Sequence, residues 1–137
     1  MTDPLSIEPV MQKDVADCGV ACLAMLLGES YAAVRATIRQ RELDGISNRQ
    51  LRRIAHRFGK PLRFIRNGDL SEMVGIVDLQ RPTNPERRAG AWEGHYVVLI
   101  KGAIYNPADG LIWTDIEAWL AHRRWELLGV FIRKEDA

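Results

Sequence analysis

The chain has 137 residues, of which 47% are apolar and 27% are charged, with 19 basic and 18 acidic side chains. This length fits one domain over residues 1–137, and the apolar fraction excludes wholesale disorder. No apolar run approaches the roughly 20 residues of a membrane-spanning helix. The N-terminus lacks the basic and apolar regions of a signal peptide, and two cysteines make no disulfide framework. We therefore expect a cytoplasmic protein in a reducing environment.

Residues 17–59 are predicted to be helical and to follow a polar, proline-containing arm over residues 1–16. Three helices are expected, at 17–28, after Ser30 and over 47–58. In the first, Asp17 is a candidate N-cap and Gly28 a candidate C-terminal glycine around an almost wholly apolar run. In the third, apolar residues recur at i, i+3, i+4 and i+7, and the arginines lie off that stripe.

Residues 60–137 are predicted to be mainly β. Five short runs rich in Val, Ile, Leu and aromatic residues are bounded by Gly, Pro, Asn or charged residues, which is typical of strands. These runs are 62–65, 74–79, 95–100, 103–105 and 127–132. A short helix is expected over 115–123, and the polar stretch 80–94 is expected to be a long loop. Helices followed by strands predict an α+β fold with an antiparallel sheet.

Cys18 is the candidate nucleophile. It is predicted in the first turn of a buried helix, where unpaired N–H groups and the helix dipole favour an anion. A lowered thiol pKa is therefore expected. The alternative is a buried, unreactive thiol, which is what we expect of Cys22 one turn further on. His95 begins a long apolar strand and is the candidate base, whereas His56 and His122 lie among arginines and are expected at the surface.

Asn106 is the candidate third member of the site. If residues 101–102 form a two-residue hairpin turn, Asn106 becomes the diagonal neighbour of His95 on the same face of the sheet. A side chain at that place can hold the imidazole towards a thiol. The alternative is that Asn106 only forms an Asx turn before Pro107.

Gln12 is the candidate oxyanion donor. Acyl transfer needs donors aimed at the oxyanion, and the Gln12 amide with the Cys18 N–H could supply two. The alternative for Gln12 is a solvated side chain. The Cys and His residues make no plausible zinc set, so no metal or cofactor is expected.

Three separated segments resemble the motifs of one enzyme family. Residues 12–26 resemble the active-site segment of the bacteriocin-processing, double-glycine-leader cysteine peptidases of the papain-like clan. Residues 94–99 resemble their histidine strand, and residues 106–110 resemble their Asp-Pro-x-x-Gly turn. The three motifs occur in the family's order, between about residue 8 and residue 112.

The resemblance implies a papain-like fold and peptide-bond hydrolysis through a thioester. It implies Cys18 as nucleophile, His95 as general base and acid, Asn106 as orienting residue and Gln12 as oxyanion donor. The family usually has Asp where this chain has Asn106, and an amide can fix the imidazole tautomer but cannot offset an imidazolium charge. Most members also carry membrane-spanning and ATP-binding parts, and we expect neither in this sequence. A leader peptide is thus a candidate substrate and a separate transporter a candidate partner.

Two other functions stay open. The first is a catalytically silent peptide-binding domain of the same fold, which the amide at position 106 allows. The second is nucleic-acid binding by residues 35–66. This segment contains ten basic and two acidic residues and has a net charge of +8. We expect this segment to be a solvated helical face or a surface for an acidic partner, because aromatic residues for base stacking are missing nearby.

Overall fold

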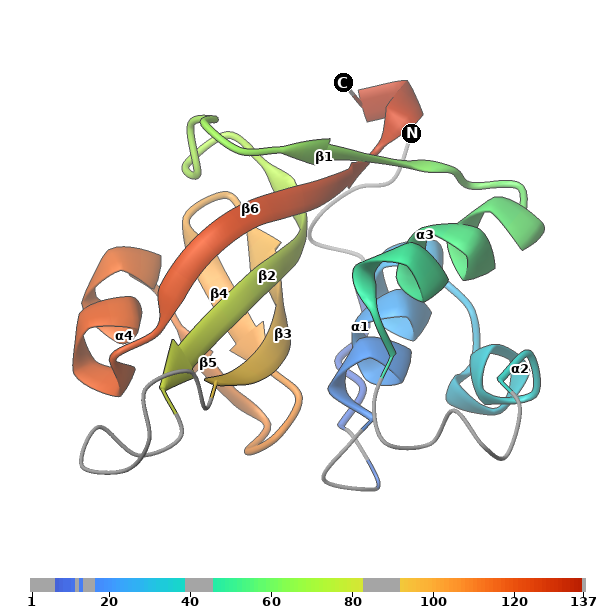
Figure 1. The fold of residues 1–137 in the computed structure, drawn as a ribbon, viewed down its shortest axis with the longest axis horizontal. Coiled ribbons are helices and arrows are strands. Elements are labelled where there is room, and N and C mark those ends of the chain that lie inside the picture. The colour runs from blue at the N-terminus through green and yellow to red at the C-terminus, as the bar shows by residue number, and fades with distance from the viewer. Residues whose placement is uncertain (1–6, 12, 14–16, 39–45, 83–91, 137) are drawn as a thin grey trace.

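The computed structural model of the chain describes residues 7–11, 13, 17–38, 46–82 and 92–136. In these residues three helices precede a six-stranded antiparallel sheet, and a fourth helix lies between the last two strands in sequence. Figure 1 shows α1, α2 and α3 together on one side of the molecule, with the sheet and α4 on the other. The predicted α+β fold is confirmed.

The elements follow the expected order. The helices are α1 (Cys18–Leu27), α2 (Tyr31–Arg35), α3 (Asn48–Arg57) and α4 (Ile116–Arg123). The strands are β1 (Leu62–Ile65), β2 (Val74–Pro82), β3 (Trp92–Ile100), β4 (Ala103–Asn106), β5 (Leu111–Trp113) and β6 (Glu126–Arg133), followed by a 3-10 turn, η3 (Lys134–Asp136). The strand order in the sheet is β1-β6-β2-β3-β4-β5. None of the helices in the described ranges has the length and apolarity that crossing a bilayer requires.

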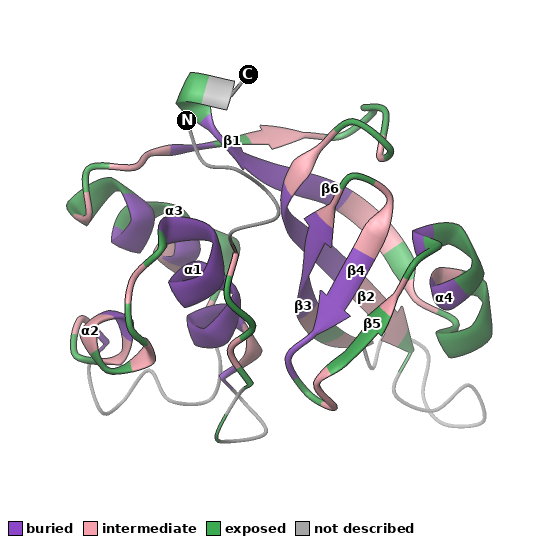
Figure 2. Ribbon diagram, turned by 180° about the vertical axis from the view of Figure 1, so that it is seen from behind, coloured by how far each residue is buried: buried purple, intermediate pink, exposed green. Residues whose placement is uncertain are grey.

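Helix α1 is the buried centre of the helical side, and Figure 2 shows it buried along its length. Residues 19–27 are all buried, and Gly28 ends the helix in the left-handed conformation with φ 68°, as predicted. Asp17 occupies the N-cap position, as predicted, but its side chain makes no capping hydrogen bond. Its carboxylate instead accepts hydrogen bonds from the Tyr31 hydroxyl and from the Lys13 backbone N–H, the latter at 3.3 Å. These bonds tether the arm and α2 to the start of α1.

Helix α3 is amphipathic, as its periodicity predicts. Ser47 caps it: the Ser47 hydroxyl accepts from the Gln50 N–H at 3.2 Å, and the Gln50 side chain accepts from the Ser47 N–H at 2.7 Å. Leu51, Ile54 and Ala55 are buried, and the arginines between them are exposed. The capping box and the apolar stripe together hold the polar face of α3 outward.

The two faces of the sheet have separate cores because side chains alternate along each strand. On β3, Tyr96 and Val98 pack into the core that surrounds α1. Val97 and Leu99 point the other way, into a second core that includes Trp119 of α4. His95 shares the second face by the same alternation. The sheet thus separates α1 from α4.

The hairpin that aligns His95 with Asn106 forms as predicted. Ile100 pairs with Ala103, and the two turn residues have positive φ angles, 45° at Lys101 and 86° at Gly102. Positive φ at both positions is the geometry that matches the twist of the flanking strands. The glycine takes this conformation without a Cβ penalty, which favours the turn at this point in the chain.

The predicted bounds of the loop over residues 80–94 are wrong at both ends. β2 continues to Pro82 and β3 begins at Trp92, so His95 lies inside β3 and pairs with Leu79. Arg81 and Glu93 pair across the extended strands, with Arg81 Nε 2.5 Å from Glu93 Oε1, and this opposite-charge pair favours the longer strands. Residues 83–91 of that loop lie outside the described residues. Sequence analysis also missed β5, which is only three residues long.

Gly75 gives a test of this packing. A Cβ on Gly75 would lie 2.3 Å from the Phe131 carbonyl oxygen of the neighbouring backbone, so Gly75→Ala must displace a strand. We expect it to lower the free energy of unfolding by about 1–3 kcal/mol in urea denaturation. Gly94→Ala is the control, because its Cβ would meet only the Leu79 oxygen at 3.7 Å. Equal losses in the two variants would contradict the close approach.

Candidate active site

Cys18 is the first residue of α1 and is partly exposed, whereas Cys22 is 0% exposed one turn deeper. Both thiols are free. Gly19 lets this end of the helix approach the sheet, because a Cβ there would lie 2.5 Å from Ile46 Cγ1 and 3.2 Å from Tyr96 Cδ2. The start of α1 is therefore pressed against β3.

The backbone of Tyr96 lies close enough to the Cys18 thiol to lower its pKa by hydrogen bonding. The paired ladder between β3 and β4 ends at Val98 and Tyr105, so the Tyr96 backbone lies beyond it. Tyr96 follows His95 directly in the chain. This contact brings the thiol to the segment of β3 that carries the imidazole.

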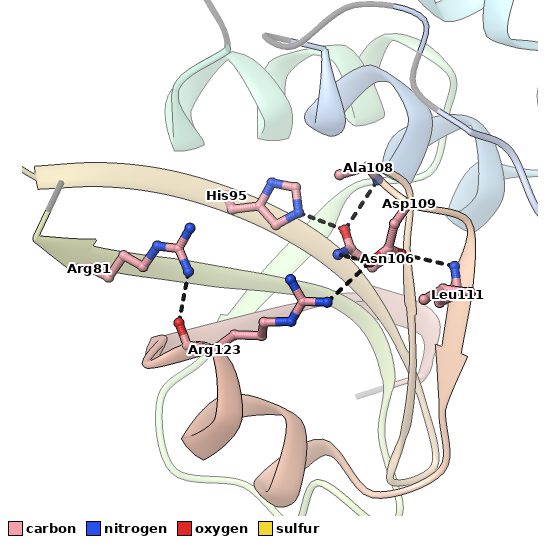
Figure 3. A network of polar contacts seen from close by, with 7 residues as sticks. All are labelled: Arg81, His95, Asn106, Ala108, Asp109, Leu111 and Arg123. Atoms are coloured by element: carbon pink, nitrogen blue, oxygen red, sulfur yellow. Dashed lines mark hydrogen bonds and ion pairs between the residues drawn. The ribbon is translucent and has the colours of Figure 1, made fainter.

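His95 and Asn106 are in direct contact, as the hairpin argument predicts: His95 Nε2 lies 2.8 Å from Asn106 Oδ1 (Figure 3). The same Oδ1 accepts the Ala108 backbone N–H at 3.1 Å. A backbone N–H needs an acceptor, so this bond identifies the oxygen of the amide, and His95 Nε2 must be the donor to it. The other ring nitrogen, Nδ1, is left to accept a proton. One oxygen atom of Asn106 therefore both contacts the imidazole and closes the turn before Ala108.

Asp109 holds the other end of the Asn106 amide. Asn106 Nδ2 donates to Asp109 Oδ2 at 3.3 Å, and Asp109 Oδ1 accepts the Leu111 N–H at 2.9 Å. Arg123 Nη2 lies 3.7 Å from the same carboxylate. With Asn106 only 7% exposed, the amide cannot rotate without breaking several of these bonds. Figure 3 shows this network reaching from the hairpin to the end of α4.

Trp125 and Arg81 belong to the site although no sequence pattern pointed to them. The Trp125 ring stacks on His95 with 5.5 Å between ring centroids and 21° between ring planes. Arg81 Cζ lies 3.9 Å from the Trp125 ring centroid, and Arg81 Nη1 donates to the Arg123 carbonyl at 2.7 Å. Trp125 thus supports one side of the imidazole, while Arg81 fixes Trp125.

The model of the peptidase C39 family matches residues 6–121. The chain belongs to the peptidase C39 family. The resemblance seen in the three sequence motifs is thereby confirmed, and with it the general chemistry of the family, which is that of cysteine peptidases. A search of curated proteins found no matching relative.

The thiol pKa of this C39 domain differs from the sequence prediction. Burial raises the pKa of Cys18 above its ordinary value of 9.0, and the Asp17 charge adds to the rise. Backbone hydrogen bonds from Tyr96 and Gly19 lower it, but they do not outweigh burial. The predicted lowering is therefore wrong, because a closely packed helix start removes the water that would solvate a thiolate. At neutral pH the Cys18 thiol keeps its proton.

Burial also lowers the pKa of His95 from 6.5. The hydrogen bond from His95 to Asn106 raises it, the positive charge of Arg81 lowers it, and Glu93 and Asp109 raise it. The net result is a neutral imidazole at pH 7. A neutral ring with Nδ1 unprotonated is the form that can take a proton from a thiol.

A cavity of about 410 Å³ lies beside His95 in the C39 domain. Its lining includes Asn106, Asp109, Trp119 and Trp125, so it opens on the side of the sheet that faces α4. A cavity of this size can accept a peptide side chain or a short stretch of backbone.

The other residues considered in the sequence analysis lie away from this contact or outside the described residues. Gln12 lies outside the described residues. His56 and His122 are exposed, as predicted. Within the described part of the chain, no cluster of His, Cys, Asp and Glu could hold a metal ion.

Two substitutions near His95 are expected to shift its pKa in opposite directions. Arg81→Gln removes a cation and should raise the pKa of His95, whereas Asp109→Asn removes an anion and should lower it. The Asn side chain keeps an acceptor for the Leu111 N–H, so the turn is preserved. NMR titration of the His95 ring measures both shifts, from a wild-type pKa below 6.5. Shifts of the same sign in the two variants would contradict the assignment.

Proposed function

We propose that the chain is an active cysteine peptidase with a papain-like Cys18–His95–Asn106 site. One observation carries the proposal: the 2.8 Å hydrogen bond from His95 Nε2 to Asn106 Oδ1 leaves Nδ1 as an acceptor, one residue from the Tyr96 backbone that contacts the Cys18 sulfur. A thiol, a neutral base and a group that orients the base are the elements that nucleophilic catalysis needs.

The reaction follows from these groups. The Cys18 thiol attacks the carbonyl carbon of the scissile bond, and its proton passes to His95 Nδ1. The tetrahedral intermediate then collapses to a thioester, and the amine leaves with the proton from His95. Water attacks the thioester with His95 as the base, which releases the acid and restores the thiol. We assign the oxyanion to the Cys18 N–H and the Gln12 amide.

The resting pair is neutral on this proposal. The raised pKa of Cys18 and the lowered pKa of His95 both oppose a preformed thiolate–imidazolium pair. The proton therefore moves during attack, when the developing imidazolium is stabilised by the Asn106 oxygen and, at longer range, by Asp109. Asp109 supplies part of the negative charge that an aspartate at position 106 would give.

A peptide cleaved after a double-glycine-type leader is the substrate we propose. The support is family membership together with the resemblance of the three motifs to leader-processing peptidases. The same resemblance makes a separate transporter the candidate partner. A catalytically silent peptide-binding domain is the second candidate, since position 106 carries an amide in place of a carboxylate.

Labelling with Ala-Gly-Gly chloromethyl ketone tests the function. We expect one covalent adduct at Cys18 and none at the buried Cys22, measured by intact mass and peptide mapping. The rate should fall as the pH drops through the lowered pKa of His95, below 6.5, and should rise again above 9, where the thiol ionises. His95→Ala should remove the first of these steps and leave the second.

Two controls complete the labelling experiment. Cys18→Ala should abolish the adduct while the circular dichroism spectrum stays that of the wild type. An adduct at Cys22, or a pH profile that His95→Ala leaves unchanged, would exclude the proposed site and favour the silent peptide-binding domain.

Asn106 separates an orienting role from a structural one. Asn106→Ala removes the acceptor for His95 and should lower the labelling rate at pH 7 on the order of tenfold or more. Asn106→Asp keeps the acceptor and adds charge, so it should stay active and raise the pKa of His95. Ala108→Pro removes the N–H that completes the Asx turn but keeps the Asn106 acceptor for His95, and it is the control. A lowered thermal midpoint with an unchanged rate in Asn106→Ala would leave a Cys18–His95 dyad.

A further inference from the structure

A second hollow, of about 450 Å³, lies between α3 and the strands β1 and β6. It is lined by Asn48, Arg49, Arg52, Phe64, Arg66 and Phe131. None of these residues lines the cavity beside His95. The hollow is therefore a second candidate binding site, and we call it the arginine hollow.

The arginine hollow carries positive charge that no described carboxylate offsets. Arg49 and Arg52 lie one turn apart on the exposed face of α3, and Arg66 follows β1. All three side chains are exposed, and no carboxylate of the described residues lies within ion-pair distance of them. Three guanidinium groups around one hollow repel one another and offer paired donors to an anion, and carboxylates fit such donors in bidentate geometry.

The floor of the hollow is apolar. Phe64 and Phe131 are in contact, with 4.6 Å between ring centroids, and Phe131 is only 1% exposed. The Phe64 ring also lies against Gly129, where a Cβ would come within 2.3 Å of Phe64 Cζ. The sheet therefore covers Phe131, while Phe64 is partly exposed and can contact an aliphatic side chain.

The hollow is held open by a partly buried polar network. Asn48 Nδ2 donates to Asp78 Oδ2 at 2.7 Å, and the Tyr96 hydroxyl donates to Asn48 Oδ1 at 2.6 Å. The Tyr96 hydroxyl lies 3.2 Å from the Ile46 carbonyl as well. These bonds fix the first turn of α3 to β2 and β3, so Arg49 and Arg52 keep their place relative to Phe64.

We propose that the arginine hollow binds an acidic peptide segment of a partner protein, with its carboxylates on Arg49, Arg52 and Arg66 and an aliphatic side chain against Phe64. The mixture of exposed guanidinium groups and a partly exposed aromatic ring fits alternating acidic and aliphatic residues. The site is separate from the catalytic cavity, so the partner binds whether or not the chain cleaves a peptide. Membrane insertion does not fit this face, because the exposed large apolar residues among those described lie elsewhere, at Met11, Leu111 and Ile112.

Binding of a fluorescein-labelled peptide, (Glu-Leu)₄, to the Cys18→Ala chain tests the proposal by fluorescence anisotropy. We expect (Gln-Leu)₄ to bind at least tenfold more weakly, and the affinity for (Glu-Leu)₄ to fall as salt rises. The double variant Arg49→Gln/Arg52→Gln should lose at least tenfold in affinity, and Arg66→Gln should weaken binding in the same direction.

The matched control is Arg57→Gln/Arg63→Gln, which removes the same charge from the same basic segment outside the hollow. It should change the affinity by less than twofold. An equal loss in the control, or equal binding of the two peptides, would overturn the proposal by showing a diffuse charge effect. Tighter binding of a 20-base-pair DNA duplex or of phosphatidylserine vesicles through Arg49 and Arg52 would overturn the peptide assignment, and so would a dimer of the chain that the double variant abolishes.

Discussion

The Oδ1 atom of Asn106 is the point on which the candidate site depends. It accepts the His95 Nε2–H and the Ala108 N–H at the same time, so one oxygen orients the imidazole and closes the turn after β4. The hairpin at residues 101–102 supplies the register that makes this possible. Asp109 then prevents the amide from turning over, because it accepts the hydrogen bond from the amide nitrogen. The tautomer of His95 is therefore a consequence of backbone geometry rather than of a neighbouring charge.

Burial favours the neutral forms of both Cys18 and His95. Burial of Cys18, where α1 approaches β3 at Gly19, raises the pKa of the thiol, and burial of His95, which stacks on Trp125 at the other face of the sheet, lowers the pKa of the imidazole. Each change disfavours the ionised form, so an aspartate at position 106 is not needed to hold a resting imidazolium. An amide oxygen can accept the hydrogen bond of a neutral imidazole. Without a salt bridge, the ring is held by stacking on Trp125, which Arg81 contacts in turn.

Two polar sites lie on the helical side of the molecule, and their properties depend on different physical effects. At the start of α1 the Cys18 thiol is largely buried, and its pKa depends on desolvation. At the start of α3 the arginines remain solvated, and their use depends on the sign and spacing of charge. The Asn48–Tyr96 hydrogen bond joins the two regions through β3, but each is built from its own residues. The proposed catalysis and the proposed partner binding therefore rest on separate residues.

The sequence by itself determined most of the order of elements and the contact between His95 and Asn106. The periodicity of α3, the apolar run of α1 and the turn at residues 101–102 are local signals, and the hairpin register alone predicts that Asn106 lies beside His95. Only the tertiary structure showed that Trp125, from the segment just before β6, stacks on His95, because no local pattern records which distant strand will lie alongside. It also reversed the expected pKa of Cys18. The helix position favours a thiolate, but desolvation depends on how closely α1 packs against β3, and packing is a property of the whole fold.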